Sequence, residues 1–382
     1  MCRYARLFVI NIQVCNIAPA IIKNSMKQKL IFTNIVGEAI DDLIADLGNP
    51  QVAVVADTNT AQYVLPVLRN DSKAVAGATL ITVKAGDDNK SIDELTGLWK
   101  ALSNMEATRS TVVVNLGGGV VSDLGGFAAA TFKRGMRCIN VPTTLLAAVD
   151  ASVGGKTAIN FNGIKNQIGA FAEPEAAIIS TIYFNTLPEQ QLLSGYAEML
   201  KHGLLDTDEV LAKLLTFSPV YPVFDSEALL PLLESSVLVK SKIVEQDFAE
   251  TGTRKALNLG HTVGHALESF ALAAHSPIPH GYAVAWGMVV ELVLSHMEQG
   301  FASDTLHKFA AYILKNYGAF PLTCDDYDSV IADMRQDKKN DSPDNINFTL
   351  LKAVGDPVIN CTVDVEKIKA AFDIYRDLMH LA

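Results

Sequence analysis

The chain has 382 residues, of which 49% are hydrophobic and 19% charged, and its formal net charge at pH 7 is -11. Two domains are expected, because a single hydrophobic core stops growing near this length. The hydrophobic content excludes a disordered chain, and the acidic balance argues against a nucleic-acid partner, whose phosphates it would repel. Any phosphate must therefore be bound by locally clustered Lys and Arg.

Cysteine usage and apolar runs bear on where the protein resides. The five cysteines are odd in number and show no CxxC spacing, which favours a reducing cytoplasm over a disulfide framework. No apolar run reaches the length of a membrane span, and the stretch from Leu7 to Ile12 is too short for a secretion signal. Met26 opens a plausible second start, so residues 1–25 are interpreted as an N-terminal extension outside the fold.

Four β-branched segments alternate with helical stretches in the first half. They cover residues 51–57, 78–84, 111–117 and 137–142 and are apolar on both faces. Strands of this kind are typical of a parallel sheet that helices cover on both sides. Residues 26–185 are therefore predicted to form a Rossmann-like α/β domain that binds a dinucleotide.

A glycine run follows the third of these segments. Gly117, Gly118 and Gly119 stand between a strand and a segment with the apolar spacing of a helix. Glycines at such a turn let backbone N–H groups approach a pyrophosphate at the helix N-terminus. The run does not match GxGxxG, so a tight turn without a ligand stays an alternative.

A second glycine-rich segment spans residues 149–171. Lys156, Lys165 and Asn166 lie there among small residues, and the segment is interpreted as a loop. On an acidic protein, two such lysines indicate an anion site. Solvated loop lysines would give the same pattern, and Lys133 and Arg134 upstream allow the same two interpretations.

From about Pro188 onward, apolar residues recur at helical spacing and strand signals nearly vanish. Segments 192–205, 227–246 and 283–299 show this pattern most clearly. Residues 186–382 are predicted to form an α-helical domain that binds metal and substrate. The linker is expected near residues 180–188, which end in a proline of the kind that often precedes a helix.

The sharpest local signal is the pair His261 and His265, which share one face if their segment is helical. The glutamate of HExxH is missing, which disfavours a metalloprotease. His280 follows downstream, and Glu198 adds a carboxylate to an otherwise apolar helix. A Glu with two His is a recurrent catalytic zinc set with an open position. A buried structural histidine or a surface carboxylate would equally explain any single member.

Four polar residues interrupt the apolar patterns of the same half, namely Lys201, Lys240, Arg254 and Asn258. A divalent metal beside several cations requires a polyanionic ligand to balance the charge. A small molecule with carboxylate, hydroxyl and phosphate groups meets this requirement.

Taken together, these segments resemble the 3-dehydroquinate synthase family. The matching stretches, in the family's order over roughly residues 50–355, are GGGVVSDLGGFAAATFKRG, NVPTTLLAAVDASVGGKTAIN, GIKNQIGAF, GYAEMLKHGLL, NLGHTVGHALE, HGYAVAWGM and DMRQDKKND. Phe248, Thr253 and Tyr282 depart from the family's usual residues, and no residue with assigned chemistry is lost.

The resemblance implies a site residue by residue. Zinc ligands fall on Glu198, His261 and His280, and cobalt is a further suitable ion. Substrate-binding and catalytic residues fall on Asp150, Lys156, Lys165, Asn166, Lys201, Lys240, Glu250, Arg254, Asn258 and His265. Arg134 matches an arginine that members donate to the neighbouring subunit's phosphate pocket, which implies a homodimer. The segment DKK supplies Lys338 or Lys339.

The resemblance also implies where NAD+ binds. Asp57 and Asn59 would lie near the adenosine, and Asp87 and Lys90 would line the cofactor loop that follows. The pyrophosphate would contact Gly118, Gly119, Val120, Val121 and Asp123, and the rest of the cofactor Thr143, Thr144, Lys156 and Lys165.

The reaction implied is the conversion of 3-deoxy-D-arabino-heptulosonate 7-phosphate to 3-dehydroquinate and phosphate, a step of the shikimate pathway. It would proceed by transient NAD-dependent oxidation, β-elimination of phosphate, re-reduction and intramolecular aldol closure. His265 is the candidate for proton transfer at hydroxyls, since imidazole titrates near neutral pH. No dedicated base is assigned to the C–H proton, which the departing phosphate can itself take.

Three alternatives remain at this level. One is another sugar-phosphate cyclase, of the 2-deoxy-scyllo-inosose or valiolone type, and another is a metal-dependent alcohol or polyol dehydrogenase, which would release NADH. The third is a noncatalytic NAD-binding regulator that retains the fold.

Overall fold

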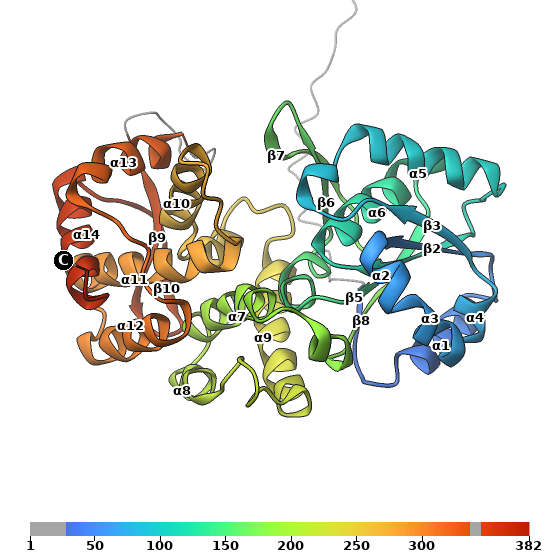
Figure 1. The fold of residues 1–382 in the computed structure, drawn as a ribbon, viewed down its shortest axis with the longest axis horizontal. Coiled ribbons are helices and arrows are strands. Elements are labelled where there is room, and N and C mark those ends of the chain that lie inside the picture. Colours follow the sequence, from blue (N-terminus) through green and yellow to red (C-terminus); the bar gives the residue numbers. More distant parts are fainter. Residues whose placement is uncertain (1–27, 337–344, 382) are drawn as a thin grey trace, which may run out of the picture.

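The computed structural model describes residues 28–336 and 345–381 (Figure 1). Its first half is built on a six-stranded sheet in the order β1-β8-β5-β4-β2-β3, in which every strand pair is parallel. The strands are β1 (Lys29–Phe32), β2 (Val52–Asp57), β3 (Thr79–Val83), β4 (Val112–Gly117), β5 (Arg137–Pro142) and β8 (Ala176–Ile179). The four strands predicted from β-branched runs are confirmed, and β1 and β8 are additional.

Successive residues of the central strands face opposite helical layers, as expected for strands that are apolar on both sides. Val52 and Val54 pack into a core shared with α1 (Val36–Asp46), α3 (Leu65–Asp71) and α4 (Lys73–Ala76). Ala53 and Val55 pack into a second core with α5 (Ile92–Asn104) and α6 (Gly119–Thr131). The first half is therefore a three-layer α/β/α structure, and the Rossmann-like prediction is confirmed.

The segment interpreted as a loop at 149–171 has more regular structure than expected. It contains a π-helical turn, η3 (Ala147–Ala151), and an antiparallel hairpin of β6 (Lys156–Phe161) and β7 (Ile164–Phe171). The loop interpretation was wrong, because Gly163 at positive φ closes a tight hairpin turn between two segments that pair antiparallel, from Lys156 with Phe171 to Phe161 with Ile164. Lys156, Lys165 and Asn166 therefore lie on strands.

The second half is mainly helical, as predicted. Its helices are α7 (Glu189–Leu204), α8 (Asp208–Thr216), α9 (Ser226–Gln246), α10 (His261–Ala273), α11 (His280–Gln299), α12 (Ser303–Tyr317), α13 (Tyr327–Arg335) and α14 (Val365–Leu378). A short 3₁₀ segment, η4 (Ile182–Thr186), precedes α7 and follows the last strand of the sheet. In Figure 1, α7 and α9 lie between the sheet and the remaining helices.

One hairpin in this half was not anticipated. Strands β9 (Asn347–Ala353) and β10 (Asp356–Thr362) pair antiparallel beside α11. Phe348, Leu350 and Leu351 of β9 are buried in the same core as the helices. Among the described helices, none is both long and apolar enough to cross a membrane.

Candidate metal and substrate site

Three helices bring Glu198, His261 and His280 together. His261 and His280 are the first residues of α10 and α11, and Glu198 lies in α7. Glycines permit these helices to approach: a Cβ on Gly287 would stand 2.2 Å from the Gly260 carbonyl oxygen, and one on Gly281 would stand 1.9 Å from that of Ser194. Any larger side chain at these positions would move the helix ends apart.

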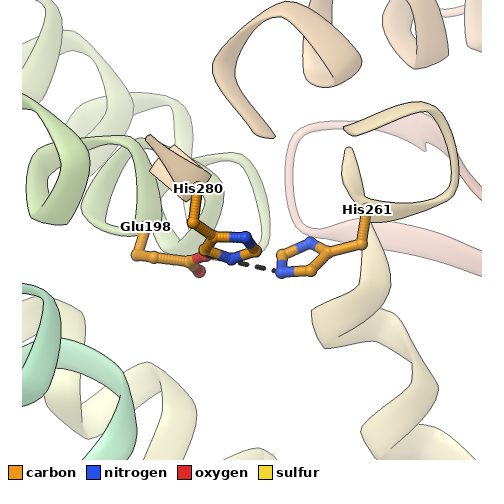
Figure 2. A group of neighbouring side chains, drawn as sticks. All are labelled: Glu198, His261 and His280. Carbon is orange, nitrogen blue, oxygen red and sulfur yellow. Dashed lines mark ion pairs between the residues drawn. The ribbon is translucent and has the colours of Figure 1, made fainter. Parts of the chain in front are cut away.

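The Glu198, His261 and His280 side chains converge on one point (Figure 2). Nε2 of each histidine lies 3.4 Å from Oε1 of Glu198, and one ligand atom from each residue lies within 4.8 Å of the others. Glu198 is 1% exposed, and neither of its carboxylate oxygens has a hydrogen bond of normal geometry among the described residues. A buried carboxylate with two imidazole nitrogens just beyond hydrogen-bond distance fits a divalent cation such as zinc.

The other ring nitrogens of both histidines are held by acceptors. Nδ1 of His261 lies 3.1 Å from the Leu259 carbonyl oxygen, and Nδ1 of His280 lies 2.8 Å from Oε2 of Glu268. Partners of this kind fix the tautomer that leaves Nε2 free for a metal. Sequence reasoning missed Glu268, although it follows His261 by seven residues and His265 by three on the same helix face.

The protonation of these groups follows from burial and their neighbours. Burial, and then the Lys201 ammonium, lower the pKa of His261 to about 3. Burial would raise the pKa of Glu198, but Lys201 and then His261 hold it well below its usual range. Burial would lower the pKa of His280, yet its contacts with Glu198 and Glu268 raise it to about 10. A cation bound between Glu198 and His280 displaces that proton.

Four buried cationic side chains surround this centre in a chain of net negative charge. Lys90, Lys201, Lys240 and Arg254 are each 2–4% exposed. Lys201 pairs with Glu198, Lys240 with Asp150, and Lys90 with Asp123. The Arg254 guanidinium donates to the carbonyl oxygens of Phe248 (2.6 Å) and Gly154 (3.2 Å). Three of these cations meet carboxylates, whereas Arg254 donates to neutral carbonyl oxygens, so the region is still suited to an anionic ligand.

Two aspartates connect the sheet half with the helical half. Burial would raise the pKa of Asp150, but Lys240 of α9 lowers it. Burial raises the pKa of Asp123 in α6 to about 6, against the opposing effect of Lys90. Asp150 also interacts electrostatically with Glu198 and Asp123, so the predicted cofactor and metal residues lie in one electrostatic cluster.

The β6–β7 hairpin adds polar groups to the cluster. Lys156 pairs with Glu250, and Lys165 lies 3.7 Å from Glu268 and 3.8 Å from Asp87. Asn166, in a left-handed conformation, accepts from Lys90. Asn160, which the sequence patterns did not single out, donates to the Asp87 carbonyl oxygen (3.0 Å) and accepts from the Asn166 N–H (3.0 Å).

Most residues predicted to bind NAD+ lie at or just after the carboxyl ends of neighbouring strands, where ligands of such sheets bind, whereas Lys156 and Lys165 lie on the β6–β7 hairpin. Gly118 follows β4 and is the N-cap of α6, which begins at Gly119, so Val120, Val121 and Asp123 fall in the first turns of that helix. Thr143 and Thr144 follow β5, and Asp57 ends β2. The Asp57 carboxylate already accepts from the backbone N–H groups of Asn59 and Thr60 (2.8 Å each).

His265 and four other predicted site residues differ in how closely they lie to this cluster or in whether the structure describes them. The His265 ring lies 5.3 Å from that of His261 and 5.9 Å from that of His280, and forms a second potential ligand set with Glu268 and His280. Asn258 lies in the 3₁₀ segment η5 (Thr253–Asn258), half-buried. Arg134 is exposed and has no ion pair within the described part of the chain. Lys338 and Lys339 lie outside the described residues.

His202, next to Lys201, is fully buried and gives the fold a measurable pH dependence. Its Nδ1 lies 2.9 Å from Ser236 Oγ, and burial, followed by Lys201, lowers its pKa to about 3 from 6.5. The unfolded chain takes up this proton first, so the contribution is complete above pH 6.5 and is lost as pH falls toward 3. Between pH 6.5 and 5 the loss is about 2 kcal/mol. Urea unfolding at both pH values should show a smaller loss for His202→Gln, and an equal loss would contradict the assignment.

Two family models together match the chain over most of its length. The model of the 3-dehydroquinate synthase N-terminal part matches residues 80–194, and that of the C-terminal part matches residues 195–340. A 3-dehydroquinate synthase of Parabacteroides distasonis is 45% identical over 351 residues, which cover 92% of this chain and 98% of that protein.

Solved structures share the fold at lower identity. A 2-deoxy-scyllo-inosose synthase complexed with carbaglucose-6-phosphate, NAD+ and Co2+ aligns with a TM-score of 0.77 and 23% identity, over 92% of this chain and 96% of that one. A 2-epi-5-epi-valiolone synthase of Streptomyces hygroscopicus with NAD+ and Zn2+ aligns with a TM-score of 0.75 and 21% identity, over 98% and 99%. Since both halves match one family and a relative aligns at 45% identity over nearly its whole length, the chain belongs to the 3-dehydroquinate synthase family.

Proposed function

We propose that the chain is a lyase that converts 3-deoxy-D-arabino-heptulosonate 7-phosphate into 3-dehydroquinate and phosphate. The family and the relatives that carry this name support the reaction. The observation that carries the proposal is the convergence of Glu198, His261 and His280 beside buried lysines, because such a set suits a metal-assisted reaction of a polyanionic substrate.

In this proposal Glu198, His261 and His280 hold zinc or cobalt, and the carboxyl edge of the sheet from Asp57 to Thr144 holds NAD+. The two fold neighbours solved with NAD+ and Co2+ or Zn2+ support this pairing. Once bound, the metal supplies Lewis-acid polarisation of substrate oxygens and the dinucleotide supplies reversible acceptance of a hydride. Glu268 keeps the His280 ring oriented through its hydrogen bond to Nδ1.

The basic residues would bind the substrate's anionic groups at two ends. Lys156, Lys165 and Asn166 of the hairpin, with Arg134 from a neighbouring subunit, would hold the phosphate. Lys240 and Arg254 would face the carboxylate and nearby oxygens, where their burial keeps water away and strengthens each contact. Fixing one substrate conformation among charges placed in advance is the chain's main contribution to the rate.

Proton transfer would involve residues between these two ends. His265 would take and return hydroxyl protons, because its ring lies within 6 Å of both metal-ligand histidines. Asp150 would stay ionised beside Lys240 and hold that ammonium toward the site. Lys201, Glu250 and Asn258 would complete the polar lining, and the departing phosphate would take the C–H proton.

The assembly and location of the protein are also proposals. We infer a homodimer, which the exposed position of Arg134 supports. A division into units at residues 26–185 and 186–382 is supported by the end of the sheet at Ile179 and the start of α7 at Glu189. The scattered cysteines, among them the free Cys138, Cys324 and Cys361, support a cytoplasmic location.

The proposed reaction predicts phosphate release without accumulation of NADH. Purified protein incubated with the heptulosonate phosphate, catalytic NAD+ and zinc should release one phosphate per substrate consumed and show no net absorbance change at 340 nm, because the hydride returns in the same turnover. Mass spectrometry of the product should show substrate minus phosphoric acid.

Two other results would contradict the proposal. Stoichiometric NADH would indicate a dehydrogenase. Preferential turnover of glucose 6-phosphate, whose carba analogue is bound in the inosose synthase structure, would indicate the other cyclase type. Glucose 6-phosphate lacks a carboxylate, so it also serves as the matched control for the role of Lys240 and Arg254.

A further inference from the structure

Glu291 is a fully buried carboxylate with no part in the site described so far. It lies in the middle of α11, at 0% exposure. Its Oε2 accepts from the backbone N–H of Gly260 (2.6 Å), and its Oε1 accepts from those of Thr262 (3.1 Å) and Val263 (3.2 Å). The carboxylate therefore binds backbone N–H groups at the start of α10 that have no partner within the helix.

The start of α10 cannot be capped by its own sequence. Its N-cap is Gly260, in the left-handed region at φ 78°, and no side chain is available there to accept from the first N–H groups. Helices α8, α9 and α14 use Thr207, Asp225 and Asp364 at this position. Unpaired N–H groups at a buried helix end are costly. Glu291 supplies the missing acceptor from another helix, and its charge also suits the positive end of the helix dipole.

We propose that Glu291 is a positioning residue for the metal-ligand histidine His261. His261 is the first residue of α10, and the N–H groups on either side of it, those of Gly260 and Thr262, are the two bonded to opposite oxygens of Glu291. Its Nδ1 contacts the Leu259 carbonyl oxygen in the preceding turn. The direction of Nε2 thus depends on a backbone that the Glu291 carboxylate holds on both sides.

The same residue also relates the two histidines to each other. His280 is the first residue of α11, the helix that carries Glu291, so the carboxylate ties the start of α10 to a fixed point on α11. Close contact between Gly287 and Gly260 keeps the helices in this register. Metal binding needs ligand atoms placed within a few tenths of an ångström. Loss of the hydrogen bonds from the start of α10 to Glu291 should therefore weaken metal binding before it affects other properties.

The inference rests on the proposed metal site and is tested by metal affinity, independently of turnover. In Glu291→Gln, the amide oxygen still accepts a hydrogen bond, but the amide NH2 group replaces the second oxygen. This NH2 group is itself a donor, so it cannot accept from the backbone N–H groups that it faces. Thr262 Oγ1 still donates to the Asn347 carbonyl oxygen (2.9 Å) and keeps the helix start attached to β9. Titration of metal-free protein with Co2+, followed by visible absorption, should show an affinity about 10- to 100-fold weaker than wild type.

The matched control is Asp364→Ala, which removes the cap of α14, a helix that carries no site residue. It should lower the unfolding midpoint while leaving Co2+ affinity unchanged. NAD+ affinity should be unchanged in both variants, because the backbone groups that Glu291 binds, those of Gly260, Thr262 and Val263, all belong to the helical half. Glu291→Asp keeps the charge but shortens the side chain, and should give an intermediate Co2+ affinity.

The outcomes separate the inference from the proposed function. If the wild-type protein binds no Co2+, the proposed metal site itself is contradicted. Wild-type affinity in folded Glu291→Gln or Glu291→Asp, even with lower stability, would show that Glu291 only caps a helix and would overturn the inference. If Glu291→Gln does not fold, the Co2+ affinity of Glu291→Asp tests the inference, because this variant keeps a buried carboxylate at position 291 and the backbone donors of α10.

Discussion

Replacing His261 with Ala is expected to abolish metal binding and to lower turnover strongly, while leaving NAD+ binding largely intact. The substitution removes one of three converging ligands and leaves Glu198 buried with a single imidazole nitrogen. A Lewis acid contributes several kcal/mol to the transition state, so turnover should fall by about 10³-fold. Metal content by atomic emission, and NAD+ affinity by calorimetry, are the measurements.

The control for His261→Ala is His307→Ala. His307 is an exposed histidine of α12, and its Nδ1 lies 2.7 Å from the Ser303 carbonyl oxygen. The control variant should retain both metal and turnover. Full zinc stoichiometry in His261→Ala would show that this histidine is not a metal ligand. Loss of NAD+ binding in the same variant would show that the substitution disturbs the fold as well as removing the imidazole.

Replacing Lys156 with Ala is expected to raise the KM for the phosphorylated substrate by about 10- to 100-fold, the range set by one charge-assisted hydrogen bond. Lys156 begins β6 and pairs with Glu250. Without the lysine, the Glu250 carboxylate would face the incoming phosphate with one compensating positive charge fewer. Binding of a dephospho analogue should change much less, since it has no group that meets the lysine.

Lys213→Ala provides the comparison for Lys156→Ala. Lys213 is also an exposed lysine in an ion pair, with Glu209 at 2.8 Å, and it lies on α8 outside the site. Its loss should affect neither substrate. Equal weakening of the phosphorylated substrate and the dephospho analogue by Lys156→Ala would contradict the assignment of this lysine to the phosphate.

Local patterns were sufficient for much of the architecture. Runs such as 52–57 and 112–117 are apolar on both faces, and only a sheet covered on both sides can bury them. The spacing of His261 and His265 predicted a shared helix face, and α10 confirms the helix. The glycines after β4 predicted a strand-to-helix turn, which the N-cap position of Gly118 confirms.

What the patterns missed depends on contacts between distant residues. Glu291 is 31 residues from Gly260, and no spacing rule links a mid-helix glutamate to another helix's first turn. Strand β7 was interpreted as a loop because five of its eight residues are polar or small, so its partner β6 defines it more than its own hydrophobicity does. Glu268 ends the stretch NLGHTVGHALE, but its role becomes visible only once the structure places it beside His280.

The two histidines proposed as metal ligands are each the first residue of a helix, and this has an electrostatic consequence for a bound ion. Each helix presents roughly half a positive charge at its N-terminus, so two such ends direct a repulsive field at any divalent cation placed between them. The same field attracts the anionic groups of a sugar-acid phosphate. Glu198, Glu268 and Glu291 supply negative charge that offsets these helix ends and the nearby lysines. These three glutamates would therefore allow the centre to retain a divalent cation.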